Sequence, residues 1–168
     1  MGEILLSELL KKEKKSYGIV AYLEFPLRIL LAYPGGPEYP GGHRGFWSIP
    51  KGGSHGEIGW NAAVREFKEE TNLDIPQNIG KDDAINLGKI TQRSGKIVEA
   101  WGVEMEDDDI SHFKSNMFKM IWPPTKNGTE QQFPEVDKVK WFSYRDAVRY
   151  IRYDQRPFLI RLQHELDL

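Results

Sequence analysis

The alternation of apolar and polar positions along the chain predicts a series of short β-strands. The predicted strands share runs of β-branched and aromatic residues bounded by glycine, proline or polar turn residues. The turn-forming residues Arg93, Ser94 and Gly95 join two of them, which predicts a hairpin. The strands are predicted at residues 17–25, 28–33, 46–49, 84–91, 96–105 and 139–142.

A different period marks one strong helix. From residue 58 to residue 71 the apolar positions recur at helical spacing: Trp60, Ala63, Val64 and Phe67. Asn72 follows, and asparagine suits the left-handed conformation that closes many helices. The pattern therefore predicts a helix over residues 58–71.

Two further helices are predicted near the C-terminus. Ser143 is followed three residues later by Asp146, which resembles a capping box at the start of a helix. Pro157 is tolerated in the first turn of another helix that runs towards Leu166.

The remaining segments predict loops and define the fold class. Residues 34–42 are rich in glycine and proline, and residues 115–134 contain Trp122-Pro123-Pro124, so both are expected to be loop-rich. Strands interleaved with a few helices predict an α/β (α+β) fold in which helices cover a mixed sheet. The expected organisation is a charged N-terminal segment at residues 1–16 and a single domain at residues 17–168.

Composition narrows the classes of partner and compartment. The 168 residues include 39% hydrophobic and 29% charged residues, as expected for a folded globular domain. The net charge of -2 provides no basic field for DNA, and the absence of cysteine excludes disulfides and thiolate metal sites. No segment approaches the roughly 20 apolar residues of a membrane helix. The sequence predicts a cytoplasmic protein that binds neither DNA nor a membrane.

The strongest candidate chemistry lies on the predicted helix 58–71. Glu66, Glu69 and Glu70 crowd three negative charges near its C-terminus, where the helix dipole is already negative. A hard divalent cation such as Mg²⁺ would remove this repulsion, because it prefers oxygen ligands. The alternative is a solvated acidic helix end, as found on many surface helices.

The residues around this cluster resemble the Nudix box, whose pattern is G-x5-E-x7-R-E-U-x-E-E-x-G-U with U aliphatic. Residues 50–73 read PKGGSHGEIGWNAAVREFKEETNL, and both the spacing from Glu57 to Arg65 and the Arg-Glu-x-x-Glu-Glu core match the pattern. Two positions depart from it. Four residues instead of five separate Gly52 from Glu57, and Asn72 replaces a glycine.

The resemblance continues outside the box. Residues 30–37, 47–52, 122–124 and 133–137 are similar to a bacterial branch of the family described as predicted NTP pyrophosphohydrolases. The resemblance implies a Nudix-like α/β/α sandwich with a mixed central sheet.

The resemblance also implies a metal site and an ion pair. In the family, Glu66 and Glu70 are the principal metal ligands, Glu69 is a further ligand, and a carbonyl of the preceding loop joins them. The shortened loop leaves Gly52 and Gly53 as candidates for that carbonyl. The implied metal is Mg²⁺, or Mn²⁺ in its place. Glu57 and Arg65 are expected to pair and to orient Glu66.

The catalytic base implied by the family is a glutamate that activates water for attack on phosphorus. The candidates are Glu66 in the box, Glu99 on the predicted strand 96–105, and Glu135 before the last strand. Lys51, Arg93 and Lys96 are candidates for binding substrate phosphates, although each can equally be a solvated surface cation. Phe46, Trp47, Trp101 and Trp122 either stack on a base or pack in the core.

The implied reaction is hydrolysis of a phosphoanhydride bond in a nucleoside diphosphate linked to another moiety. Dinucleoside polyphosphates are a second candidate substrate, because Pro50-Lys51-Gly52 is similar to the hydrolases of those compounds. The alternative is a non-catalytic module that binds nucleotide or RNA. Such a module would be expected to have lost the box carboxylates, whereas Glu66, Glu69 and Glu70 are all present. Neither the preferred nucleotide nor the oligomeric state follows from the sequence.

Overall fold

A six-stranded mixed sheet forms the centre of the protein. The computed structural model describes residues 14–39 and 41–168, so most of the expected N-terminal segment lies outside the described residues. Five strands follow the order β4-β5-β1-β2-β8, and β3 pairs with β1. Neighbours are antiparallel except for β1 and β5, which are parallel. The bounds are β1 (Lys15–Leu23), β2 (Arg28–Pro34), β3 (Lys51–Gly52), β4 (Ile85–Thr91), β5 (Ile97–Glu104) and β8 (Val136–Ser143).

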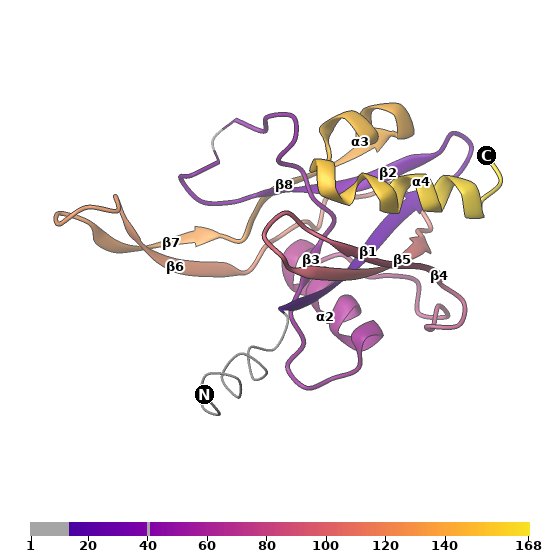
Figure 1. Cartoon of the computed structure of the whole chain (residues 1–168), viewed down its shortest axis with the longest axis horizontal. Coiled ribbons are helices and arrows are strands. Elements are labelled where there is room, and N and C mark those ends of the chain that lie inside the picture. The colour runs from indigo at the N-terminus through magenta and orange to yellow at the C-terminus, as the bar shows by residue number, and fades with distance from the viewer. Residues whose placement is uncertain (1–13, 40) are drawn as a thin grey trace, which may run out of the picture.

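Helices cover both faces of this sheet (Figure 1). Helix α2 (Gly59–Thr71) lies on one face, and α3 (Tyr144–Tyr150), the 3-10 helix η1 (Tyr153–Gln155) and α4 (Arg156–Glu165) lie on the other. Successive residues of β1 alternate between the two layers: Ile19 packs in the core of α2, and Val20 packs in the core of α4. This double burial explains why β1 and β2 are almost continuously apolar. The predicted α/β/α sandwich with a mixed central sheet is confirmed.

The termini of the predicted elements agree closely with the structure. Strand β1 begins at Lys15, two residues before the expected start of the domain, and β8 extends the predicted strand 139–142 in both directions. Asn72 closes α2 with φ 58° and donates its backbone N–H to the Lys68 carbonyl over 2.8 Å. Ser143 caps α3 by accepting the backbone N–H of Asp146 over 3.2 Å.

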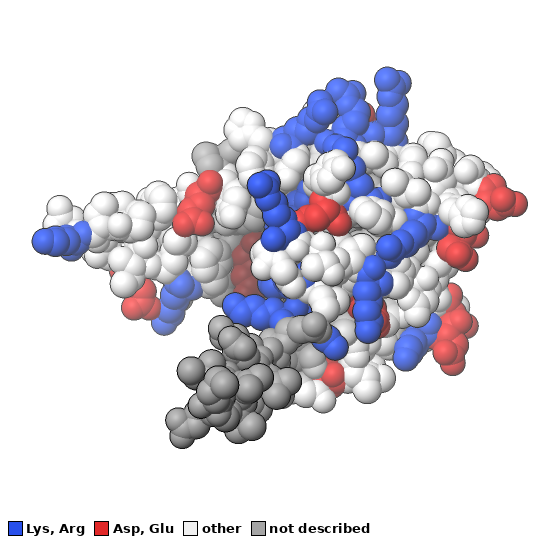
Figure 2. Space-filling model, in the orientation of Figure 1, with Lys and Arg blue, Asp and Glu red and all other residues white. Residues whose placement is uncertain are grey.

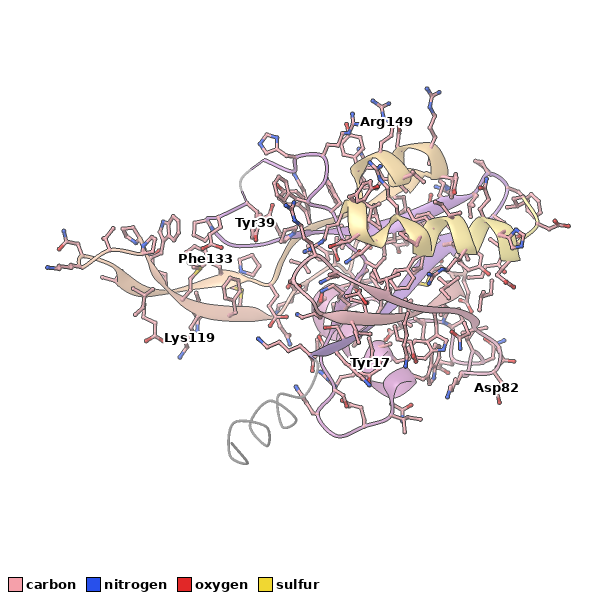
Figure 3. The ribbon with its side chains drawn as sticks, in the orientation of Figure 1. Tyr17, Tyr39, Asp82, Lys119, Phe133 and Arg149 are labelled. Carbon is pink, nitrogen blue, oxygen red and sulfur yellow. The ribbon has the colours of Figure 1, made fainter. Side chains whose placement is uncertain are left out.

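The prediction of a loop-rich segment at residues 115–134 was wrong. This segment is an antiparallel hairpin of β6 (Met117–Trp122) and β7 (Thr129–Pro134), which projects from the body as an arm (Figure 1). Phe133 and Lys119 point to opposite sides of the arm (Figure 3), as strand alternation requires. Pro123 and Pro124 lie in the turn, where their missing N–H groups cost no ladder hydrogen bond.

The predicted strand at residues 46–49 was also wrong. Its backbone groups pair with two different segments. Ser48 exchanges two hydrogen bonds with Ala32 on β2, while the Trp47 carbonyl accepts from Arg152 and the Ile49 N–H donates to the Gln155 side chain, both at η1. The segment therefore ties β2 to η1, and regular pairing begins only at Lys51.

Among the described residues, no helix is both long enough and apolar enough to cross a bilayer.

Candidate active site

Arg65 organises the loop that precedes α2. Its guanidinium forms a two-point ion pair with Glu57, with Nε and Nη2 each 3.1 Å from a carboxylate oxygen. The same side chain donates to the Gly53 carbonyl over 2.6 Å and, through Nη1, to Glu66 and Glu69 over 2.9 Å each. These acids hold the pKa of Arg65 above its usual range, with Glu57 as the main cause. The predicted pair between Glu57 and Arg65 is present, and it fixes the shortened loop to the helix.

Glu66 lies directly against the backbone of Gly52. Its side chain is buried, and a Cβ atom added at Gly52 would overlap the Glu66 carboxylate. Only glycine therefore allows this approach between the strand and the helix. A Cβ at Gly53 would meet no atom of Glu66, so Gly52 is the nearer of the two glycines to this carboxylate. The Gly53 carbonyl instead accepts a hydrogen bond from the Arg65 guanidinium.

Glu70 and Lys51 form the second contact between α2 and β3. The backbone N–H of Lys51 donates to the Glu70 carboxylate over 3.2 Å. Burial raises the pKa of Glu70 to about 8, and the nearby charges of Glu66 and Glu135 act in the same direction. Burial also lowers the pKa of Lys51 to about 8, helped by repulsion from Lys96 and Arg152. Both side chains are therefore poised to change charge near neutral pH.

This pair predicts an unusual pH dependence of stability in metal-free protein. Between about pH 4.5 and 8, folded Glu70 retains a proton that the unfolded chain releases, so stability falls as pH rises. Above about pH 8, folded Lys51 loses its proton before the unfolded chain does, so its contribution makes stability rise. Urea denaturation at several pH values measures both limbs. The Glu70→Gln variant is expected to flatten the lower limb, by up to ~1.4 kcal/mol per pH unit, and an unchanged slope would contradict this account.

A cleft of about 660 Å³ opens beside this contact. Lys51, Glu70 and Glu135 line this cleft. Partial burial and the charges of Glu66 and Glu69 raise the pKa of Glu135. Arg93 lines the cleft as well. Figure 2 shows Lys and Arg side chains gathered on this face beside the end of α4, with acidic patches among them. The cleft thus brings together the box carboxylate Glu70, the candidate base Glu135 and the candidate phosphate-binding cations Lys51 and Arg93.

Two of the four candidate site residues outside residues 50–73 do not line this cleft, Glu99 and Lys96. Glu99 sits in the register position opposite Tyr17 on β1, lines a separate pocket of about 130 Å³, and approaches Lys89 to 3.8 Å. Lys96 follows the β4–β5 turn and contributes a positive charge that acts on Lys51 without lining the cleft. Glu135 is therefore better placed than Glu99 to meet a molecule in the cleft.

The donor set suits a hard divalent cation that is shared with substrate. In the described ranges, no three acidic or histidine side chains converge on a single point, because Arg65 draws Glu66 and Glu69 towards itself. Mg²⁺ does not need such a cage, since one or two carboxylates, water and substrate phosphates commonly hold it. Burial and the charge of Glu66 disfavour the ionised form of Glu70 and so raise its pKa, and a bound cation would stabilise that ionised form.

The cleft also contains residues that the motif does not identify. Arg152, Tyr153 and Asp154 line it from the turn before α4. Asp154 accepts the Arg93 backbone N–H over 3.0 Å and pairs with both Nε and Nη2 of Arg152 at 3.2 Å. Phe46 lines the cleft and is 47% exposed, whereas Trp47 and Trp101 are buried in the core. The mixture of charged and aromatic residues at 152–156 is the only sequence signal for this wall.

A buried glutamine holds this wall in place. The Gln155 side chain is fully buried, accepts the Ile49 N–H, and donates to Ser48 Oγ and Gln92 Oε1, each over 3.0 Å. It thereby connects η1, the segment before β3 and the end of β4.

Replacing Gln155 with alanine is expected to destabilise the fold by roughly 3 kcal/mol, because the change leaves several buried polar groups without partners. Urea denaturation measures the loss. Gln77→Ala, at an exposed position, serves as the matched control. A loss for Gln155→Ala no larger than that of the control would show that the buried network contributes nothing.

The chain matches a known protein family over most of its length. The family model of the NUDIX domain matches residues 24–162. The chain belongs to the NUDIX domain family. This confirms the predicted family and, with it, the predicted class of pyrophosphohydrolase. The comparison with curated proteins gave no match.

Solved structures of Nudix proteins share the fold. An Ap4A hydrolase of C. elegans in a binary complex is 23% identical, covers 90% of this chain and 98% of its own, and has a TM-score of 0.64. The NUDIX domain of Shewanella oneidensis NrtR, complexed with ADP ribose, is 14% identical, covers 98% of this chain and 97% of its own, and also has a TM-score of 0.64. At these identities the likeness establishes the arrangement of sheet and helices.

Proposed function

We propose that this Nudix protein hydrolyses a phosphoanhydride bond in a nucleoside diphosphate linked to another moiety, in a reaction that depends on Mg²⁺ or Mn²⁺. The observation that carries the proposal is the double contact between β3 and α2. Lys51 meets Glu70 at the cleft, where Glu135 and Arg93 also lie, and Gly52 meets Glu66 one residue further along β3. A phosphate chain in this cleft would meet carboxylates suited to a cation and side chains that are themselves cationic.

Glu66 and Glu70 would hold the metal, together with the Gly52 carbonyl. A bound divalent cation would neutralise phosphate oxygens and stabilise the negative charge that develops on them. Glu69 completes the acidic cluster from the side of Arg65, to which it is paired over 2.9 Å. Arg65 and Glu57 position Glu66 through their ion pair.

Glu135 is the proposed general base. A water molecule attacks phosphorus, a bridging P–O bond breaks, and the leaving phosphate takes the electron pair. Glu135 accepts the proton that the attacking water loses, which its raised pKa favours. Lys51 and Arg93 meet phosphate oxygens as positive charges, and Lys96 adds to the field from outside the cleft.

A panel of nucleotides tests the proposal. The protein is incubated with Mg²⁺ and nucleoside triphosphates, ADP-ribose or a dinucleoside tetraphosphate, and products are separated by ion-exchange chromatography. Ap4A and ADP-ribose belong in the panel because one solved structure of the same fold is an Ap4A hydrolase and another is a NUDIX domain complexed with ADP ribose. Cleavage of at least one phosphoanhydride, abolished by EDTA, is expected. Intact substrates throughout, with nucleotide still bound, would instead indicate a binding module.

A further inference from the structure

Glu135 lies at the root of the β6–β7 arm, where the arm joins the body (Figure 1). In the hairpin, Met117 pairs with Pro134. The next backbone N–H, that of Glu135, extends this ladder by donating to the Asn116 carbonyl over 2.8 Å. The Glu135 carbonyl accepts the Gly35 N–H over 2.9 Å, and a Cβ atom at Gly35 would overlap the Pro134 carbonyl, so glycine is required there. Both backbone polar groups of Glu135 are therefore held by neighbouring segments.

The segment that precedes β6 is tied to the last turn of α2. The carbonyls of a last helical turn have no partner within the helix. Here the Asn116 N–H donates to the Glu69 carbonyl over 3.0 Å. Two residues earlier, the Lys114 N–H donates to the Thr71 carbonyl over 3.1 Å. This segment therefore connects the end of the box helix with the backbone of Glu135.

Ser115 contributes a side chain to this connection. Its hydroxyl accepts the Val136 backbone N–H over 2.8 Å and donates to the Asn116 carbonyl over 2.9 Å. The Asn116 carbonyl thus accepts two hydrogen bonds, one from Ser115 and one from the Glu135 N–H. A single hydroxyl therefore holds the residue after Glu135 and the carbonyl to which Glu135 donates.

We infer that Ser115 is a positioning residue, whose hydroxyl sets the place of the Glu135 carboxylate relative to the carboxylates of α2. The inference rests on the proposed function, in which Glu135 accepts a proton from the attacking water. Reacting groups must lie about 3–3.5 Å apart, and a misplacement of about 1 Å lowers a rate on the order of 100-fold. Ser115 does not line the cleft, so it acts through Glu135 and without contacting substrate.

Steady-state kinetics on a substrate from the nucleotide panel provide the first test. Ser115→Ala is expected to lower kcat roughly 10- to 100-fold and to change KM less than about twofold, because only the transition state uses the base. Ser115→Thr keeps the hydroxyl and is expected to restore most of the lost kcat. Ser111→Ala removes an exposed hydroxyl from the same connection between β5 and β6 and is the matched control.

A double-mutant cycle with Glu135→Gln tests whether Ser115 acts through Glu135. Residues that act as one unit show non-additive effects. In the Glu135→Gln background, Ser115→Ala is therefore expected to lower kcat less than about twofold. Multiplicative effects of the two changes would overturn the inference, as would a kcat of Ser115→Ala equal to that of the Ser111→Ala control.

Amide hydrogen exchange tests the contact without using activity. The Val136 amide is expected to exchange roughly 2- to 10-fold faster in Ser115→Ala than in the wild type, as loss of one hydrogen bond predicts. Unchanged protection would overturn the inference. A wild-type protein that hydrolysed no nucleotide would overturn the proposed function and the inference with it, whereas an active wild type with multiplicative effects in the cycle would overturn the inference alone.

Discussion

Glu66→Gln and Glu70→Gln are each expected to lower kcat/KM for nucleotide hydrolysis on the order of 10²–10³-fold. Each change preserves side-chain size but removes a charged oxygen ligand of the metal. Metal stabilisation of the transition state is worth several kcal/mol. A loss of about 1.4 kcal/mol corresponds to a tenfold lower rate. Steady-state rates with saturating Mg²⁺ measure the loss. The apparent Mg²⁺ requirement of the residual activity is expected to rise as well, because the remaining carboxylate holds the cation alone.

Stability measurements separate this effect from misfolding. Glu70→Gln removes a carboxyl whose ionisation is penalised by burial, so the metal-free variant is expected to unfold at the same or a higher urea concentration than the wild type at pH 8. Glu165→Gln, at an exposed position on α4, is the matched change in net charge. If the Glu66 and Glu70 variants kept activity within threefold of this control, the metal site would have to lie elsewhere.

The box and the fold class could be predicted because they depend on local spacing. Helical periodicity and the pair of Glu57 and Arg65 place the carboxylates on one helix next to its feeding loop, and the structure contains that pair at 3.1 Å. The sequence leaves Gly52 and Gly53 as candidates for the loop carbonyl, and only the structure shows that Gly52 lies against Glu66. Such features need only a few consecutive residues and a known helix geometry.

The rest of the cleft depends on contacts between distant segments, which spacing does not reveal. Arg93 and Asp154 are 61 residues apart, and Gln155 and Ile49 are 106 apart, yet both pairs are hydrogen-bonded. The misassigned strand at residues 46–49 has the same cause, since its backbone partners lie on β2 and η1 rather than on one neighbouring strand. The sequence offers both Phe46 and Trp47 for stacking on a base. Only the folded chain shows that Phe46 is exposed and Trp47 is buried.

The choice of general base gives the second large expected effect. Glu135→Gln is expected to lower kcat on the order of 10²–10⁴-fold, the usual range for loss of general acid–base catalysis, because its carboxylate lines the cleft. Glu99→Gln is the matched control variant. Glu99 lies on β5, next to β1, and the change is expected to alter kcat less than threefold. Glu99 lies in a different pocket and approaches Lys89.

The pH profile distinguishes a base from a residue that only shapes the cleft. Partial burial and the charges of Glu66 and Glu69 raise the pKa of Glu135 in the metal-free protein. The acidic limb of kcat/KM, measured with Mg²⁺, is expected to follow the ionisation of Glu135. Glu135 must be ionised to accept a proton, so activity rises with pH through that limb. In Glu135→Gln the limb should vanish from the residual activity. If the acidic limb persisted in Glu135→Gln and disappeared in Glu99→Gln, the base would be Glu99. Substrate would then have to reach the separate pocket that Glu99 lines.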